Sequence, residues 1–528
     1  MSGTFQIVLH AHLPFVRHPE NDVHLEEAWL FEAISETYLP LLDACDALDR
    51  DAVPGRFAIS LSQPLIAMLD DELLRERFER HLTGLVALAE SERDRTAGDP
   101  VFEPLATWYH DRFTHQLERY RNRWRRDLAG AFAGFHQTGR IELFTCVGTH
   151  GSLPLMLRDA SRRAQIVTAA EHFAERFGFT ARGMWMGECA YWPGVDKMLA
   201  DAGVRFSFVD GHGIERASSP PVRGLFAPIV SDHGVAFFGR DPDSSSQVWS
   251  SEEGYPGDPN YREFYRDVGF DLPADYIAPW IHPDGIRVHT GVKYYRVTGE
   301  GDDKKPWNPG RAFDVARAHA RHYVWCREQQ LAWASERLDV APHVTSPYDA
   351  ELFGHWWFEG PWFLEHVLRE AAQHPHVSAD TPGAYLERVP VQQIAEPSPS
   401  SWGENGYFGV WLNPRNAWMH RGLQRGELVL QQAVDRYRGT SARADRALRQ
   451  AARELLLAQS SDWAFIVTTD TAVEYAEQRT RQHLANLDAI ADGLGGDDPD
   501  GLDALVAALE DRSPIFPKVR PELWASTP

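Results

Sequence analysis

Short apolar runs alternate with long amphipathic segments over roughly the first 400 residues. The first run, Phe5 to Leu9 (FQIVL), is typical of a buried strand that ends at His10, and residues 26–48 have helical spacing. Further strands are expected at residues 56–61, 141–146, 183–186, 205–209, 235–238 and 343–348. Strands that alternate with helices favour parallel βα units, and six or seven such units favour a barrel.

Three segments depart from this alternation. Residues 71–139 are rich in Arg, Glu and Leu with helical period, which predicts a helical insertion, and residues 255–310 carry the Gly, Pro, Asp and Tyr of a long structured loop. From residue 401 the pattern is helical only, with helices expected at 417–438, 442–460 and 471–494 and a turn or linker at 495–501. We therefore expect an α/β barrel domain (1–400) that contains the insertion (71–139), and an all-helical C-terminal domain (401–528).

Composition constrains the partners of the protein. Of 528 residues, 43% are hydrophobic and 24% charged, and no apolar run reaches the roughly 18 residues of a membrane helix, so we expect no membrane partner. Residues 1–9 lack a basic leader, which predicts no signal peptide and a cytoplasmic protein. The net charge of −23 argues against a nucleic-acid partner and fits a neutral substrate.

Cysteine and tryptophan usage narrows the class of protein further. The four cysteines form no CxxC pair, which argues against a zinc ribbon and against a disulfide framework. The 18 tryptophans are an unusually high number. Aromatic rings stack on the apolar faces of sugars, so they favour a carbohydrate cleft, while a Trp-rich core is the alternative for part of the set.

Polar side chains follow the expected strands at their C-terminal ends, where active sites of parallel barrels lie. They are His10, His12, His150, Glu188, Asp210, His212, Asp349 and Glu351. Glycosidic cleavage requires two carboxyl groups. Glu188 has tryptophans near it, and Asp349 precedes an aromatic run, where a dry setting would keep it protonated. For any single carboxylate the alternative is a helix cap or an ion pair.

Three motifs resemble those of glycoside hydrolase family 57. They are HAHLPF (10–15), GMWMGECAY (183–191) and YDAELFGHWWFEGPWF (348–363). The resemblance continues through THGSLPL (149–155), GYPGDPNYREFYRDVGFDL (254–272), SSWGENGYFGVWLN (400–413) and SSDW (460–463). It covers nearly the whole chain in order, and within the family it is closest to the α-1,4-glucan branching enzyme group.

The resemblance implies an incomplete (β/α)7 barrel followed by a helical domain. It implies a retaining mechanism in which Glu188 is the nucleophile and Asp349 the acid/base, on an α-1,4-glucan such as amylose, glycogen or a maltooligosaccharide. The substrate-binding residues that it implies, together with neighbours of the two carboxylates, are His10, His12, Trp29, His150, Trp185, Asp210, Trp280, His355, Trp356, Trp402, Trp411 and Asp462. We expect no cofactor and no catalytic metal, and the sequence predicts no oligomeric state.

One segment departs from the family pattern. Branching enzymes transfer the cut chain to a glucan 6-hydroxyl, and a mobile loop tipped by a Tyr is held to cover the cleft in this family. The corresponding residues, about 213 to 254, contain no Tyr, and none occurs from Trp192 to Gly254. We therefore expect cleavage and transfer with appreciable hydrolysis. An α-amylase-type hydrolase and a 4-α-glucanotransferase of the same family are the alternatives.

Two further functions are compatible with parts of the sequence. A metal-dependent carbohydrate deacetylase could use His10, His12 and His150 as imidazole ligands, although no carboxylate is clearly placed to complete the metal site. A non-catalytic glucan-binding protein would need the tryptophans but neither Glu188 nor Asp349.

Overall fold

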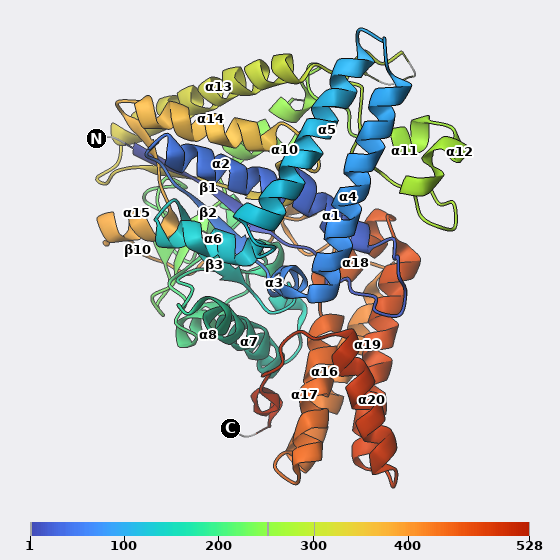
Figure 1. The fold of residues 1–528 in the computed structure, drawn as a ribbon. Helices are drawn as coiled ribbons and strands as arrows, with labels where there is room; N and C mark the ends of the chain where they lie inside the picture. Colours follow the sequence, from blue (N-terminus) through green and yellow to red (C-terminus); the bar gives the residue numbers. More distant parts are fainter. Residues whose placement is uncertain (1–2, 251–252, 300, 302, 527–528) are drawn as a thin grey trace.

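The structure is a computed structural model that describes residues 3–250, 253–299, 301 and 303–526. A parallel sheet lies among helices, and the C-terminal helices project from one side of the sheet-containing part (Figure 1). The strands are β1 (Gly3–Ala11), β2 (Phe57–Leu61), β3 (Ile141–Cys146), β4 (Met184–Trp185), β5 (Phe206–Val209), β6 (Ile229–Val230), β7 (Ala236–Gly239), β8 (His343–Asp349), β9 (Val377–Ala379) and β10 (Gln393–Ile394).

The strand order is that of an incomplete barrel. One sheet runs β4-β3-β2-β1-β8 with all neighbours parallel, and β5 pairs in parallel with β7 in a second sheet. A bridge between Gly183 and Phe206 joins β4 to β5, and the Asp241 amide donates to the Thr345 carbonyl (2.9 Å) between the end of β7 and β8. The prediction of a (β/α)7-type barrel is confirmed, because all seven expected strands form it.

The central strand explains why the apolar run near the N-terminus becomes a strand. All nine residues of β1 are buried, and β1 pairs with β2, β8 and β9. A strand covered on both faces reads as a continuous apolar run rather than an alternating one. The short strands β6, β9 and β10, of two or three residues each, were not predicted.

The helices of the barrel part follow the predicted alternation. They are α1 (Glu27–Ala33), α2 (Leu39–Arg50), α3 (Gln63–Asp70), α4 (Glu72–Arg95), α5 (Phe102–Glu118), α6 (Leu128–Gln137), α7 (Asp159–Phe177), α8 (Val195–Asp201), α9 (Gly211–Glu215), α10 (Pro242–Trp249), α11 (Val268–Asp271), α12 (Ala274–Ile277), α13 (Pro309–Ser335), α14 (Gly360–Gln373) and α15 (Pro382–Arg388). A π-helical turn, η1 (Ile34–Tyr38), joins α1 to α2, so the expected helix 26–48 is nearly continuous. Such π turns are frequent at functional sites.

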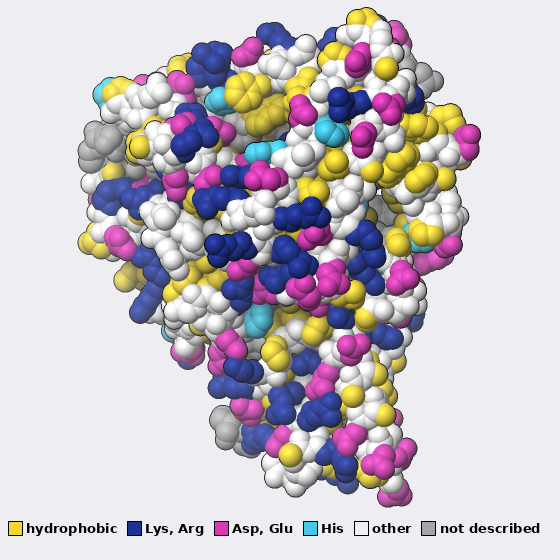
Figure 2. All heavy atoms as spheres, viewed as in Figure 1, with side chains coloured by type: hydrophobic (Ala, Val, Ile, Leu, Met, Phe, Trp, Pro, Cys, Tyr) yellow, Lys and Arg dark blue, Asp and Glu magenta, His cyan; other side chains and the backbone are white. Residues whose placement is uncertain are grey.

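Residues 71–139 are helical, as the sequence predicts. Helices α4 and α5 pack against each other, and a second π turn, η2 (Arg119–Arg123), follows α5. Acidic and basic side chains are interspersed on the face shown in Figure 2. Among the exposed pairs made by residues 71–139, Arg121 lies 2.8 Å from Glu79 and Arg123 lies 2.7 Å from Asp46. Exposed pairs of this kind contribute little to stability, about 0–1 kcal/mol, so they mainly keep this segment solvated.

The C-terminal part is helical, and two of its helices, at residues 461–469 and 499–512, were not predicted. It comprises α16 (Ala417–Tyr437), α17 (Ala442–Ala458), α18 (Ser461–Thr469), α19 (Val473–Leu494) and α20 (Pro499–Arg512). The segment 495–501, expected to be a turn or linker, contains the start of α20. The Asp498 side chain accepts from the Gly501 amide, and Pro499 occupies the first turn, which is a recognised start signal for a helix.

Several single-turn segments complete the chain. They are η3 (Leu153–Leu155), η4 (Gly187–Cys189), η5 (Tyr255–Gly257), η6 (Ala278–Trp280), η7 (Ala350–Leu352), η8 (Glu404–Gly406) and η9 (Pro521–Trp524). Two of them, η4 and η7, directly follow β4 and β8 and carry candidate carboxylates. In the described part of the chain, we find no helix with the length and apolar character needed to cross a bilayer.

Candidate active site

The sheet register places polar side chains of three adjacent strands side by side. His10 of β1 is the register partner of Ser60 on β2 and of Asp349 on β8. The Ser60 hydroxyl and His10 Nδ1 are 2.6 Å apart, which fixes the orientation of the imidazole. The C-terminal ends of the strands therefore converge on one site, as expected for a parallel barrel.

The loop that carries Glu188 has a strained backbone. Glu188 and Cys189 have φ values of 63° and 49°, and His150 in the neighbouring loop has φ 60°. A Cβ at Gly187 would lie 2.6 Å from the His150 carbonyl oxygen, so the two loops are in close backbone contact. Left-handed conformations of non-glycine residues cost about 1–3 kcal/mol each and cluster at functional sites.

Two neutral donors hold the Glu188 carboxylate. Trp402 Nε1 donates to Oε2 (2.9 Å) and the Ser461 hydroxyl donates to Oε1 (2.8 Å). Burial raises the pKa of Glu188 to about 7, although both hydrogen bonds act to lower it. Without these donors the carboxylate would lose its proton only at a still higher pH.

Asp349 is the more strongly perturbed carboxyl group. Burial raises its pKa well above the usual range, and the negative charges of Glu351, Glu188 and Asp462 raise it further, against Arg240. Asp349 therefore keeps its proton to a higher pH than an ordinary aspartate does. A carboxyl group that stays protonated beside one whose anion accepts two hydrogen bonds is suited to the role of acid next to a nucleophile.

Three histidines and one tryptophan form a row of rings beside the carboxylates. Ring centroids are 4.0 Å apart for His12 and His150, 4.9 Å for His10 and His150, and 4.6 Å for His10 and Trp185. Burial lowers the pKa of His10 and of His150 well below the usual range, so both are neutral. His10 and His150 therefore offer neutral imidazoles, which can donate or accept hydrogen bonds with sugar hydroxyls.

His12 differs from the other two histidines because it has an acidic partner. Its Nε2 lies 2.9 Å from Asp462 Oδ2. Burial acts to lower the pKa of His12, but the Asp462 carboxylate outweighs it and raises the pKa. Burial acts to raise the pKa of Asp462, yet His12 holds it at about 2. The two residues form a partly buried ion pair between the barrel and α18.

A third carboxyl group, Glu351, is near enough to Asp349 for its charge to raise the pKa of Asp349. Its Oε1 accepts from the His12 amide (3.1 Å) and from the Tyr38 hydroxyl (2.5 Å), and Tyr38 is the last residue of the π turn η1. Burial raises the pKa of Glu351 to about 7. Its charge at higher pH disfavours ionisation of Asp349, so this residue contributes to keeping the acid protonated.

The candidate tryptophans differ in how far they are buried. Trp402 is half-buried at the carboxylates, with ring centroids 5.0 Å from Trp185 and 5.9 Å from Trp249. Trp185 is fully buried below His10, and Trp411 is only 2% exposed. A direct contact of either ring with a glucan stays a prediction.

The other candidates lie at the periphery or are engaged with neighbours. Asp210 caps α9 through the Gly211 amide and pairs with Arg240 at 2.8 Å. The ring centroid of Trp29 lies 5.9 Å from that of Tyr475, and the ring centroid of Trp280 lies 6.0 Å from that of Tyr276. His355 Nδ1 is 3.6 Å from Glu32 Oε2. Trp356 is 55% exposed and stacks on Phe264, with ring centroids 4.4 Å apart. Their roles in substrate binding stay predictions.

Sequence reasoning missed several residues that complete the site. Ser461 touches both Glu188 and His150, whose Nδ1 is 2.9 Å from its hydroxyl. Its position beside Asp462 in SSDW was the available signal. Arg240 directly follows β7, and the strand-end criterion applied to that strand would have found it. Tyr38 had no sequence signal, because its role depends on the π turn.

The segment without tyrosine carries an aromatic residue at the site nonetheless. Helix α10 begins with the Asp241 side chain accepting from the Ser244 amide (2.7 Å) and ends at Trp249, which is 38% exposed. Trp249 is the residue whose ring lies 5.9 Å from that of Trp402. Residues 251 and 252 of this segment lie outside the described residues.

The comparisons with known proteins agree with one another on the family. Residues 6–305 match the profile described as glycosyl hydrolase family 57, and residues 423–524 match that of the 1,4-alpha-glucan branching enzyme C-terminal region. A 1,4-alpha-glucan branching enzyme of Thermococcus kodakarensis is 32% identical over 94% of this chain and 74% of its own length.

Solved structures of relatives match over the full chain. The alpha-amylase AmyC of Thermotoga maritima superposes with a TM-score of 0.93 at 37% identity and covers 100% of both chains. A family 57 branching enzyme of Pyrococcus horikoshii gives 0.90 at 29% identity over 100% of this chain and 98% of its own. The chain is thus similar to proteins described as branching enzymes and to one described as an amylase, and it belongs to glycoside hydrolase family 57.

Proposed function

We propose that the protein is a retaining 1,4-α-glucan branching enzyme that also hydrolyses an appreciable part of its substrate. The observation that carries the proposal is the pairing of two unlike carboxyl groups. Glu188 accepts hydrogen bonds from Trp402 and Ser461, while burial, and then the neighbouring negative charges, raise the pKa of Asp349 and favour its protonated form. Retaining glycosidases require one carboxylate that acts as the nucleophile and one protonated carboxyl group that acts as the acid.

In the first step Glu188 attacks the anomeric carbon of an α-1,4-linked glucose unit. The bond from that carbon to the 4-oxygen breaks, and Asp349 transfers its proton to the departing oxygen. The product is a glycosyl ester on Glu188 and a shortened glucan. Neutral His10 and His150 are suited to hydrogen-bond the hydroxyls of the sugar that reacts.

In the second step the acceptor attacks the glycosyl ester. Asp349, now ionised, takes the proton of a glucan 6-hydroxyl, the new α-1,6 bond forms, and Glu188 leaves as a carboxylate. Two displacements retain the anomeric configuration. When water takes the place of the 6-hydroxyl, the same step gives hydrolysis.

The balance between transfer and hydrolysis depends on how well the cleft excludes water. Two features support a mixed outcome. The segment 213–254 has no Tyr, although Trp249 places a ring near Trp402. The relatives include branching enzymes and a protein described as an alpha-amylase. A predominant α-amylase or 4-α-glucanotransferase activity is the alternative within the family.

The proposal assigns distinct roles to the two parts of the chain. Residues 1–400, with the helical insertion 71–139, form the catalytic barrel domain, and residues 401–528 form a helical domain that contributes to the glucan groove. Trp402, Ser461 and Asp462 support this division, because they contact barrel residues from the helical part. The substrate is an α-1,4-glucan, and free thiols at all four cysteines suit a cytoplasmic site of action.

Linkage analysis of amylose treated with the wild-type protein, beside Glu188→Gln, tests the proposal. We expect new α-1,6 linkages together with released reducing sugar, and neither product from the variant. Reducing sugar without new linkages would favour the amylase alternative, and longer α-1,4 chains alone would favour the glucanotransferase. If the wild-type protein bound amylose without changing it, the non-catalytic glucan-binding alternative would be favoured.

A further inference from the structure

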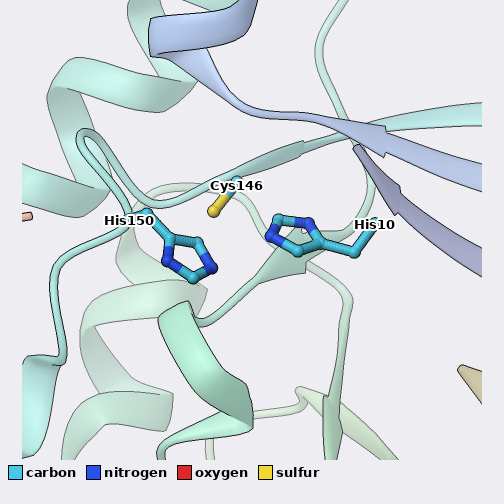
Figure 3. Close-up of side chains that lie close together, drawn as sticks. All are labelled: His10, Cys146 and His150. Atoms are coloured by element: carbon cyan, nitrogen blue, oxygen red, sulfur yellow. The ribbon is translucent and has the colours of Figure 1, made fainter. Parts of the chain in front are cut away.

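Three soft donor groups converge at the bottom of the candidate site, where Figure 3 shows them facing one another. His10 lies on β1, Cys146 ends β3 and His150 lies on the loop that follows. Their candidate ligand atoms all lie within 4.8 Å of one another, and the three residues are buried. None of the steps of the proposed reaction uses the Cys146 thiol.

The two imidazoles are held in the manner of metal ligands. Nδ1 of His10 and Nδ1 of His150 lie 2.6 and 2.9 Å from the Ser60 and Ser461 hydroxyls. The Nε2 atoms of both rings are buried and have no hydrogen-bond partner among the described residues. A second contact that fixes one ring nitrogen and leaves the other free is the usual arrangement around metal-binding histidines.

A neighbouring group of possible ligands is already engaged. His12 and Asp462, which with His150 form the second candidate cluster, bond to each other at 2.9 Å. His12 Nδ1 is also 2.8 Å from the Ser62 hydroxyl. A cation at this group would have to break the ion pair, whereas the group with Cys146 has two open nitrogen atoms and a thiol.

We propose that His10, Cys146 and His150 form an inhibitory site for a thiophilic divalent cation of the zinc type. Binding breaks the S–H bond of Cys146, releases that proton to solvent and forms a bond from Sγ to the cation. The two Nε2 atoms supply lone pairs, and the fourth position of the tetrahedron remains open for water. Thiolate and imidazole ligands favour zinc and similar soft ions over magnesium or calcium.

The cation would compete with the glucan for the same two nitrogen atoms. In the proposed reaction His10 and His150 contact the sugar, so a bound cation removes these contacts and blocks the space. The competition rests on the proposed function, whereas binding of the cation does not. We therefore expect inhibition by Zn²⁺ that is relieved by excess amylose or by a chelator.

The test measures binding of Zn²⁺ alone by isothermal titration calorimetry, using the full-length chain. Cys326→Ser is the background, because this thiol is partly exposed and lies 3.7 Å from His322 Nε2, where it could bind Zn²⁺ independently. Cys146→Ser is added to it, and Cys45→Ser, another buried thiol, is the matched control. Loss of one ligand should weaken Zn²⁺ binding at least about tenfold, while the control binds as the background does.

Co²⁺ provides a second readout that does not depend on activity. The background and the Cys45→Ser variant should show thiolate-to-cobalt charge-transfer absorption, and Cys146→Ser should not. Equal Zn²⁺ affinity with and without Cys146, or absence of the charge-transfer band in the background protein, would overturn the proposal. If Cys146→Ser fails to fold, as judged by thermal unfolding, Cys146→Ala serves for the same comparison. An inactive protein that binds Zn²⁺ through Cys146 would refute the proposed function and leave the cation site intact.

Discussion

The barrel strands and the C-terminal helices contribute different kinds of groups to one site. The barrel supplies the two carboxyl groups of the proposed reaction, Glu188 after β4 and Asp349 at the end of β8. Residues beyond 400 supply Trp402 and Ser461, which are neutral donors to Glu188, and Asp462, which pairs with His12. The barrel thus provides the reacting carboxyl groups, and the residues beyond 400 provide donors that act to lower the pKa of Glu188.

This division has an energetic reason. A carboxylate buried at the end of a strand is costly unless donors satisfy it. Hydrogen bonds to charged groups are worth about 1.5–3 kcal/mol each. The two donors from the helical part therefore offset a substantial part of the cost of ionising Glu188. Removal of Glu188 or Asp349 should abolish the reaction, whereas removal of the donors Trp402 and Ser461 should slow it and move its pH dependence.

The largest effect is expected from the two carboxyl groups themselves. Asp349→Asn removes the proton donor, and general acid–base groups contribute about 10²–10⁴-fold to rate. Glu188→Gln removes the nucleophile and should lower kcat at least as much. Steady-state release of reducing ends from amylose measures both. Appreciable turnover by Glu188→Gln would contradict its assignment.

Removal of the Ser461 hydroxyl is expected to have the next largest effect. Ser461→Ala deletes a donor to Glu188 and a contact to His150 Nδ1. Loss of one hydrogen bond to a charged group predicts roughly a 10–100-fold lower kcat/KM. Thr469→Ala, at the other end of α18, is the control, since its hydroxyl bonds only to α18 carbonyls and Thr471 among the described residues. Equal losses in the two variants would show that the effect is structural.

Trp402→Phe should shift the acid side of the pH profile. The indole donor lowers the pKa of Glu188, which stands at about 7, so its loss raises that pKa and the nucleophile ionises only at higher pH. We expect the rising limb of kcat/KM to move to higher pH, with about a tenfold lower value near neutrality. Trp192→Phe, an exposed tryptophan, is the control. A limb that stays in place would argue against the role of Trp402.

Glu351→Gln should have the smallest effect, and it should act on the alkaline side of the pH profile of kcat/KM. The charge of Glu351 raises the pKa of Asp349, so its removal lowers that pKa and the acid loses its proton at lower pH. The falling limb of kcat/KM should therefore move to lower pH. Tyr38→Phe removes one donor to Glu351 but keeps the Glu351 carboxyl group. It therefore separates the effect of the Glu351 charge on the falling limb from the effect of local packing. An upward shift in Glu351→Gln would contradict the account.

The barrel residues were accessible to sequence reasoning because local pattern determines them. Apolar runs of strand length predicted all seven barrel strands, and the polar residue after each run marks the same end of the sheet. This is sufficient to bring His10, Glu188 and Asp349 together without any knowledge of packing. The helix 26–48 was predicted for the same reason, although its π turn was not.

The helical contribution was less accessible because it depends on tertiary packing. Ser461 lies 273 residues from Glu188 in the chain, and only the docking of α18 against the barrel brings their side chains together. The burial of the tryptophans could not be predicted from the sequence either. Trp402 and Trp411 occur in one motif, yet Trp402 donates a hydrogen bond to Glu188, whereas Trp411 is only 2% exposed. The resemblance to family 57 pointed to Trp402 and Trp411 but not to Ser461, and periodicity alone pointed to none of the three.

The most direct test of the account is to identify the residue that carries the glycosyl ester. In Asp349→Asn an activated maltosyl fluoride should still react with the nucleophile, because its leaving group needs no proton, and the ester should persist because the base is missing. Mass spectrometry of the digested protein should then find the added mass on the peptide containing Glu188. Added mass on another side chain, or a product of inverted configuration without any ester, would contradict the account.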